Sequence, residues 1–235
     1  MEKDEIGGVH NMSKISDFEQ RIIKQGMTDQ DLIEYGKLLK KVRDNFLKRQ
    51  HCYTTAAKFP SENADQAINL IQFGLENFED SWFSTYQSYW HIGCIYKKIS
   101  NYEKAFASYL LAKEALGTDH PDYVKDLSIE LLWMKLHIDS FCYSQELENY
   151  YSCYITTDDF SKSFINNEFR LAVANLVIAL HYGNKVEAKE ALDKAREISK
   201  PDYLGKLYNI LARHHYKESF KTTREAENFI KNIKI

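Results

Sequence analysis

Proline and glycine are scarce in this chain of 235 residues, which contains three prolines and nine glycines. Folds built from many short strands need turn residues every few positions, so this scarcity argues against a β-sandwich or β-barrel. No stretch alternates polar and apolar residues with a period of two for long enough to predict a strand. The sequence therefore predicts an all-α chain.

The chain also lacks a large excess of charge of either sign. The chain has 31 Lys and Arg against 34 Asp and Glu, and its formal net charge is −3. A nucleic-acid-binding surface needs clustered Lys and Arg, and the sequence contains no such cluster. The longest apolar run, around residues 171–180, is interrupted by Asn175 and is about half as long as a membrane span. We expect no nucleic-acid partner and no membrane partner.

The familiar signatures of metal binding and catalysis are absent as well. The four cysteines (Cys52, Cys94, Cys142 and Cys153) form no CxxC pair, which indicates free and mostly buried thiols in a reducing cytoplasm. The sequence has no signal-peptide pattern, no glycine-rich phosphate loop, no HExxH motif and no nucleophile elbow. We therefore predict a cytoplasmic protein that is not an enzyme and has no catalytic residues, metal or cofactor.

The first residues differ in character from the rest. Gly7-Gly8 precedes Met12 at a distance that suits a bacterial ribosome-binding sequence, because GGAGGT can encode Gly-Gly. We interpret residues 1–11 as a disordered leader or a mis-annotated start, so translation begins at either Met1 or Met12. Residues 12–59 are predicted to form N-terminal helices, and residues 60–235 a repeat array.

Helix boundaries in the first half of the chain are indicated by capping residues. Thr28, with an acid three residues later at Asp31, predicts the start of a helix that runs to about Lys48. Ser61 is predicted to cap the next long helix.

Further along, the boundaries are indicated by glycine and proline. Gly117 predicts a helix end, and Pro121 a first helical turn. Polar pairs at Asp139-Ser140 and Gly183-Asn184 predict two further breaks. Together these signals predict about eleven helices.

A repeated pattern runs through these helices. The tripeptide Pro-Asp-Tyr occurs at Pro121 and again at Pro201, 80 residues later. Four alanines recur with spacings of 38, 83 and 38 residues: Ala67, Ala105, Ala188 and Ala226. The wide gap fits two units of about 41 residues, with Leu147 near its midpoint. We interpret the pattern as a helical-repeat solenoid of antiparallel helix pairs.

Residues 86–119 form the clearest unit, 34 residues long. Its first helix carries Tyr89, Ile92, Gly93 and Tyr96, and its second helix carries Ala105, Tyr109 and Ala112. This unit resembles a tetratricopeptide repeat, and the resemblance implies that Gly93 and Ala105 are small because two helices cross closely there.

The array as a whole is similar in style to peptide-sensing regulators of Gram-positive bacteria and their phages, such as the Rap proteins and the arbitrium receptor. No DNA-binding helix-turn-helix is evident in residues 12–58, which puts a direct transcriptional role in doubt. The resemblance implies that the first helix of each pair lines a concave face that binds a peptide.

Mapping the first helices onto that face selects a set of aromatic, basic and amide residues, the types that binding hot spots and backbone recognition use. The predicted partner-binding residues are Gln87, Trp90, Lys97, Trp133, Arg170, Lys206, Asn209, Arg213 and Tyr216. Two other interpretations stay open: Trp90 and Trp133 fill the core between helices, and the basic residues form a solvated face.

These observations favour a non-catalytic protein that binds a peptide or a protein segment in its concave groove, as a bacterial or phage signalling regulator does. The alternative is an immunity or inhibitor protein that masks a toxin or an enzyme with a broad surface. The sequence does not indicate the oligomeric state.

Overall fold

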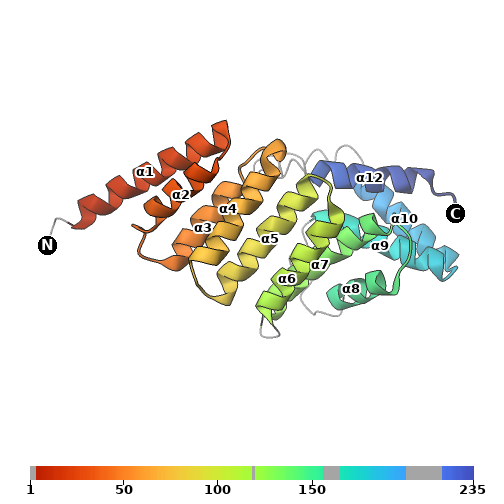
Figure 1. Cartoon of the computed structure of the whole chain (residues 1–235). Helices are drawn as coiled ribbons and strands as arrows, with labels where there is room; N and C mark the ends of the chain where they lie inside the picture. The colour runs from red at the N-terminus through yellow and green to blue at the C-terminus, as the bar shows by residue number, and fades with distance from the viewer. Residues whose placement is uncertain (1–3, 118–119, 156–164, 200–218) are drawn as a thin grey trace. The chain divides into compact units, whose positions relative to one another are not determined.

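The computed structural model describes residues 4–117, 120–155, 165–199 and 219–235, and every regular element among them is helical (Figure 1). In these ranges there are eleven α-helices and one short 3-10 helix: α1 (Asp4–Gln25), α2 (Asp29–Leu39), α3 (Asn45–Ala56), η1 (Ser61–Asn63), α4 (Ala64–Asn77), α5 (Trp82–Lys98), α6 (Tyr102–Leu116), α7 (Pro121–Ile138), α8 (Gln145–Ile155), α9 (Ile165–His181), α10 (Lys185–Ile198) and α12 (Ser219–Asn232). The described residues contain no strand, so the prediction of an all-α chain is confirmed.

The chain is divided into two compact units. Unit 1 comprises residues 1–99 and 107–117, and unit 2 comprises residues 100–106 and 118–235. Helix α6 therefore contributes its beginning to unit 2 and the rest to unit 1. The boundary predicted near residue 60 falls inside unit 1, and α1 begins at Asp4, within the segment interpreted as a leader.

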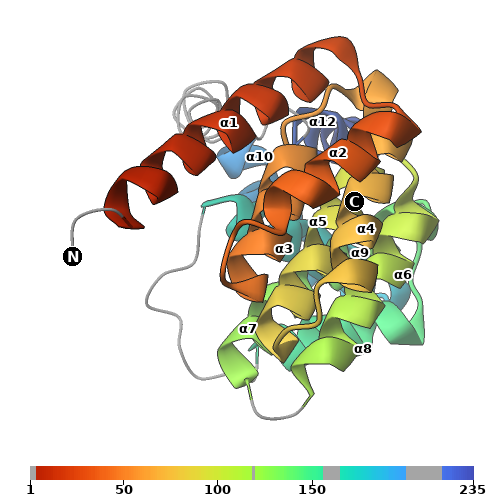
Figure 2. The same cartoon turned by 60° about the vertical axis from the view of Figure 1, so that its left-hand side comes forward.

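Within each unit the helices pack as successive antiparallel pairs. In unit 1, α1 packs on α2 and α3 packs on α4, while α5 contacts both α3 and α4. Helix α1 also contacts α3. Figure 2 shows both helices. In unit 2, α7 packs on α8 and α9 packs on α10, while α9 contacts both α7 and α8. The two units share one feature: α5 in unit 1 and α9 in unit 2 each contact both helices of the pair before them.

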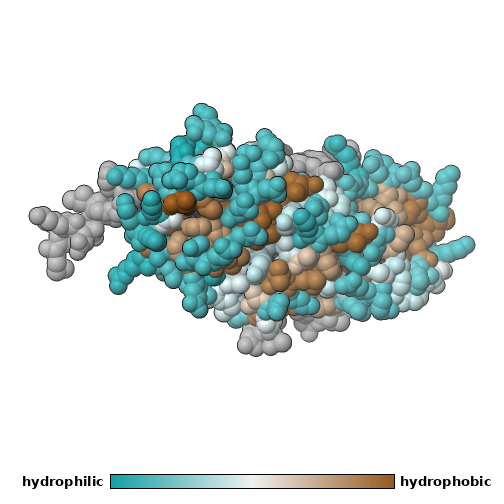
Figure 3. Space-filling model, in the orientation of Figure 1, coloured by the Kyte–Doolittle hydropathy of each residue, from teal (hydrophilic) through white to brown (hydrophobic). Residues whose placement is uncertain are grey.

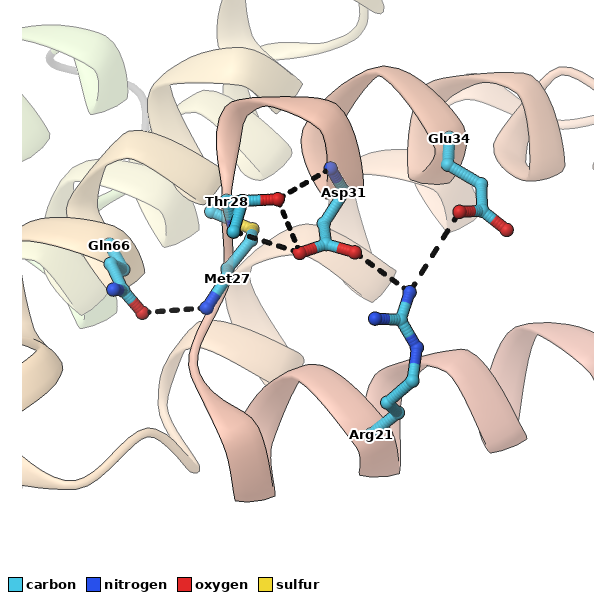
Figure 4. Close-up of polar contacts among 6 residues, drawn as sticks. All are labelled: Arg21, Met27, Thr28, Asp31, Glu34 and Gln66. Carbon is cyan, nitrogen blue, oxygen red and sulfur yellow. Dashed lines mark hydrogen bonds and ion pairs between the residues drawn. The ribbon is translucent and has the colours of Figure 1, made fainter.

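The turn between α1 and α2 is held by polar contacts on both sides (Figure 4). The Thr28 hydroxyl accepts a hydrogen bond from the Asp31 N–H, and the Asp31 carboxylate accepts one from the Thr28 N–H, which confirms the predicted capping box. Arg21 of α1 pairs with Asp31 at 2.8 Å. The Met27 N–H donates to the Gln66 side chain of α4 at 2.8 Å. One turn therefore ties α1, α2 and α4 together.

The helix that follows this cap is shorter than predicted. It ends at Leu39, and the predicted extension to Lys48 is wrong. A new helix, α3, begins at Asn45 because the Asp44 side chain accepts a hydrogen bond from the Phe46 N–H at 2.7 Å. An N-terminal cap of this kind competes with continuation of the preceding helix.

Other predicted boundaries gave mixed results. Ser61 does not cap a long helix; it opens η1, and α4 begins only at Ala64. Gly117 ends α6 with φ +62°, a left-handed conformation that glycine adopts without strain. Pro121 opens α7, and Gly183, with φ +69°, follows the end of α9. The boundaries predicted from Gly117, Pro121 and Gly183 are therefore confirmed.

Small residues lie where helices cross closely. A Cβ atom added at Gly93 would lie 2.5 Å from the Tyr109 ring, and one added at Gly36 would lie 2.7 Å from the Phe73 ring. The prediction of a close crossing at Gly93 is therefore confirmed. The alanines that recur with the repeat spacing, and the leucine midway between them, are all buried: Ala67, Ala105, Leu147, Ala188 and Ala226.

The thiols are less buried than the sequence predicted. Cys52 is buried and Cys94 is partly buried, whereas Cys142 and Cys153 are exposed. The expectation of mostly buried thiols is therefore wrong for the two cysteines of unit 2. All four are free.

Hydrophobic side chains on the surface are dispersed. On the face that Figure 3 shows, hydrophobic residues form separate patches among hydrophilic ones. Ile33, Tyr182 and Val186 are the most exposed large hydrophobic residues in the described ranges. Single exposed hydrophobic residues are ordinary on folded proteins, so exposure alone identifies no docking site here.

Candidate functional site

The residues predicted to line one partner-binding face are distributed over both units. Unit 1 carries Gln87, Trp90 and Lys97 on α5, and unit 2 carries Trp133 on α7 and Arg170 on α9. The other four, Lys206, Asn209, Arg213 and Tyr216, lie outside the described residues. Among those described, Trp133 and Arg170 are brought into contact.

The three predicted residues on α5 are all half-buried. Trp90 meets His91 edge-on, with ring centroids 5.0 Å apart, and His91 stacks in turn on Tyr53 of α3 at 4.9 Å. The Lys97 ammonium lies 5.9 Å from the centroid of the Tyr109 ring. Trp90 therefore combines core contacts with remaining exposure, and its predicted role as a partner-binding residue stays a prediction.

Trp133 and Arg170 do not lie on an open surface. Trp133 is 1% exposed and Arg170 is 4% exposed, which corrects the expectation of a solvent-facing position. The physical reason is that α7 packs on α8 and α9 and that buried residues occupy most of its circumference. Its buried residues are Leu127, Ser128, Ile129, Leu131, Leu132, Trp133, Met134, Leu136 and His137.

The two side chains form a buried cluster with Glu130. The Arg170 Nη1 donates to Glu130 Oε1 at 3.0 Å, and the guanidinium carbon lies 5.4 Å from the centroid of the Trp133 ring. A guanidinium removed from water needs a carboxylate partner, and an aromatic face adds a cation–π attraction. We name Glu130, Trp133 and Arg170 the arginine–tryptophan cluster. It joins α7 to α9.

Two nitrogen atoms in the arginine–tryptophan cluster are buried without a hydrogen-bond acceptor. They are Nε1 of Trp133 and Nε of Arg170. A buried donor that stays unpaired costs about 1–3 kcal/mol, so native proteins rarely keep one without a reason. A carbonyl or carboxylate oxygen is the group that would satisfy either atom. The cluster thus offers two donors to an acceptor that the described residues of unit 2 do not supply.

A second polar group in unit 2 adjoins Trp133. The Trp133 ring meets His137 edge-on at 4.8 Å, and His137 Nδ1 lies 3.0 Å from a Glu225 carboxylate oxygen of α12. The Tyr102 hydroxyl donates to the same oxygen at 2.8 Å. Burial is the main reason that the pKa of Tyr102 is raised to about 12. Sequence reasoning missed this group because its members are as many as 123 positions apart.

Unit 1 contains a comparable buried arginine that the sequence did not reveal. Arg49 of α3 is 5% exposed and donates from Nη1 to the hydroxyls of Ser84 (3.0 Å) and Thr85 (2.8 Å), both on α5. Its Nη2 donates to the Leu75 carbonyl at 3.3 Å, and burial lowers its pKa. In both units, therefore, a buried arginine joins two consecutive odd-numbered helices.

One carboxylate connects the first three helices of unit 1. Glu19 of α1 accepts a hydrogen bond from the Tyr35 hydroxyl of α2, and His51 Nδ1 of α3 lies 2.8 Å from the same Glu19 oxygen. Burial alone would raise the pKa of Glu19, but the hydrogen bonds from His51 and Tyr35 outweigh it and lower the pKa. Tyr35 is fully buried, and burial raises the pKa of its hydroxyl far above the usual value, so this hydroxyl keeps its proton. The arrangement therefore acts as a clamp between helices.

Metal-binding groups and membrane-spanning helices were not found in the part of the chain that the structure describes. No group of three or more His, Cys, Asp or Glu side chains in this part is placed to hold a metal ion. No helix in the same ranges is both long and apolar enough to cross a membrane. No family model, no curated protein and no solved structure matches the chain.

Proposed function

We propose that this protein is a non-catalytic, tetratricopeptide-like repeat protein that binds a peptide or a protein segment in unit 2. The bound segment would contact the arginine–tryptophan cluster once the helices that cover these side chains separate. In this proposal the protein works in the cytoplasm, as the peptide-sensing regulators that its repeats resemble do.

The helix packing supports the repeat assignment. In a stack of helix pairs, the first helix of one pair contacts its own partner and the pair before it, because each pair buries its apolar face on the next. Helix α9 of unit 2 follows this rule, and α5 of unit 1 contacts both helices of the pair before it. The close approach of Gly93 to Tyr109 and the burial of Ala105 and Ala188 add support, since both helices of such pairs need small residues where they pack closely.

The observation that carries the binding proposal is the pair of buried donors, Trp133 Nε1 and Arg170 Nε. A backbone carbonyl or a carboxylate of a bound segment would accept from either donor, and the hydrogen bond to Arg170 would be strengthened by its charge. Because both donors are already desolvated, the segment gains these bonds without a further cost of removing them from water. Aromatic and arginine side chains are also the types that concentrate binding energy.

A test of this proposal begins with a displayed library of random peptides, selected on the full-length protein. An enriched peptide is then synthesised with a fluorescein label, and its affinity is measured by fluorescence anisotropy. The informative variant is Trp133→Phe, which removes the Nε1 donor and keeps an aromatic ring. We expect it to weaken binding about tenfold, as the loss of one buried hydrogen bond should. Because the variant has no donor at this position, no unpaired donor can lower its melting temperature.

The matched control is Lys189→Glu, a charge reversal at an exposed position of α10. We expect it to leave the affinity unchanged. If Lys189→Glu abolished binding while Trp133→Phe had no effect, binding through the arginine–tryptophan cluster would be refuted. The alternative of an immunity or inhibitor protein with a broad masking surface would then take its place. A library that yields no binder at all would also count against the proposal.

A further inference from the structure

The last described helix of unit 2, α12, is attached through a charged anchor and an aromatic one. Glu225 is the charged anchor: its carboxylate lies against His137 of α7 and Tyr102 of α6, as described above. Phe229, one turn further along, stacks on Phe141 with ring centroids 4.8 Å apart and planes 15° from parallel. These contacts fix both the position and the register of α12.

The C-terminal end of α12 is held by a third contact. The Arg196 Nη2 of α10 donates to the carbonyl oxygens of Ile230 (3.2 Å) and Ile233 (3.3 Å). Carbonyl groups at the end of a helix lack partners within the helix, and a cation there also complements the helix dipole. Arg196 therefore recognises a helix end rather than a particular side chain. We name Tyr102, His137, Phe141 and Arg196 the helix-docking face.

The side chains that α12 directs toward the other helices of unit 2 follow a simple pattern. Glu225, Ala226, Phe229, Ile230 and Ile233 occupy positions i, i+1, i+4, i+5 and i+8, which lie on one side of a helix. Ala226 and Ile230 are buried, whereas Arg224, Asn228 and Lys231 are exposed. The helix-docking face thus binds a helix that carries an acidic residue followed by apolar residues at these spacings.

The group that receives Glu225 is more deeply buried than Glu225 itself, whereas Arg196, at the other end of the face, is exposed. The His137 side chain is 1% exposed and also contacts Trp133 and Phe141. Glu225, by contrast, keeps 36% of its side-chain surface exposed. The charge complementarity comes from the Glu225 carboxylate meeting an imidazole N–H and a phenol O–H, both donors. The helix-docking face is made by residues of α6, α7, α10 and the segment that joins α7 to α8, and α12 packs on it.

We propose that the helix-docking face is a binding site for an amphipathic helix of a partner protein, and that α12 is its internal occupant. A partner helix with an acidic residue followed by apolar residues at i+1, i+4, i+5 and i+8 would bind by displacing α12. The inference goes beyond the proposed function, because it concerns a different set of residues of unit 2 and a segment that binds as a helix. The affinity for such a helix is reduced by the fraction of molecules in which α12 occupies the face.

The experiment uses the full-length chain and a probe taken from its own sequence, a fluorescein-labelled peptide of residues 219–235. The double variant Glu225→Ala/Phe229→Ala removes the two anchors of α12, and alanine preserves its helix propensity. We expect this variant to bind the peptide at least about tenfold more tightly than the wild type, because its docking face is open. A peptide carrying the same two substitutions should bind neither protein, and the exposed-site variant Lys231→Ala should behave as the wild type.

Hydrogen exchange of the α12 amides provides the second readout. In the double variant these amides should lose protection while those of α7 keep it. If they are unprotected and the peptide still does not bind, the face does not accept a helix in trans and the inference is overturned. Amides that stay protected would overturn it too, because α12 would then not be displaceable. Neither result affects the proposed function, since the test at Trp133 uses different peptides and a different contact.

Discussion

Alanine at position 93 would place a methyl group where the ring of Tyr109 already lies. The added Cβ would be 2.5, 2.7 and 2.9 Å from the ring atoms Cε1, Cδ1 and Cζ. Unstrained carbon atoms pack at about 3.5–4.0 Å, so the ring would have to move by about 1 Å. Tyr109 is fully buried, and its surroundings leave it little freedom to move.

The expected change in stability is a balance of two opposing effects. Overpacking a close helix crossing costs about 1–3 kcal/mol. Replacing a glycine inside a helix by alanine returns about 0.5–1 kcal/mol of helix propensity. We therefore expect Gly93→Ala to lower the free energy of unfolding by roughly 1–2 kcal/mol.

The assay is urea unfolding followed by far-ultraviolet circular dichroism, repeated in a Tyr109→Leu background. Tyr109→Leu lowers stability by itself, but it removes the ring that the new methyl group would meet. In that background only the gain in helix propensity remains, so Gly93→Ala should become neutral or stabilising. This reversal of sign is specific to a clash between the two positions, because independent sites show additive effects.

The reasoning would be refuted by a Gly93→Ala protein that is more stable than the wild type. It would be refuted equally if the destabilisation were the same in both backgrounds. Either result would mean that the ring of Tyr109 does not limit the space at position 93.

Two further predictions concern unit 1. Glu19→Gln should remove a stabilisation that the wild type has at neutral pH. Because the pKa of Glu19 is lowered on folding, the difference in free energy of unfolding between the two proteins should shrink as the pH falls from about 7 to about 3. A difference that grew on acidification would contradict this sign. Thr28→Ala should lower the free energy of unfolding in urea by about 1 kcal/mol through loss of the capping box, whereas Thr28→Ser should restore most of it; equal stability of all three proteins would show that the cap contributes nothing.

Much of the fold could be predicted because its signals are local. The capping box at Thr28 depends on a residue three positions away, and Gly117 depends on its own φ angle. The break before α3 was missed although Asp44 is a good N-cap residue, because the apolar pattern continues across the break without glycine or proline. The N-cap residue was therefore a local signal for the break, but the continuous apolar pattern favoured one uninterrupted helix.

The candidate site was harder to predict. Trp133 and Arg170 were selected for residue type and helix position, and the structure brings them together, but in a covered place. The apolar residues of α7 occupy nearly its whole circumference, which is typical of a buried helix, and this pattern could have indicated that Trp133 is enclosed. The partner of Arg170, Glu130, is 40 positions away, and nothing in the local sequence connects them.

The sequence by itself determined that this chain is helical, where several of its helices begin and end, which alanines recur at buried positions, and that Gly93 lies close to a neighbouring helix. These properties depend on hydrogen bonds and dihedral angles within a few residues, or on a pattern that repeats along the chain. Only the tertiary structure decided that Arg170 and Trp133 are buried with unpaired donors, and that Glu225 joins α12 to Tyr102 and His137. Burial and pairing of this kind depend on which distant helices cover a side chain, and that is a property of the assembled unit rather than of any segment.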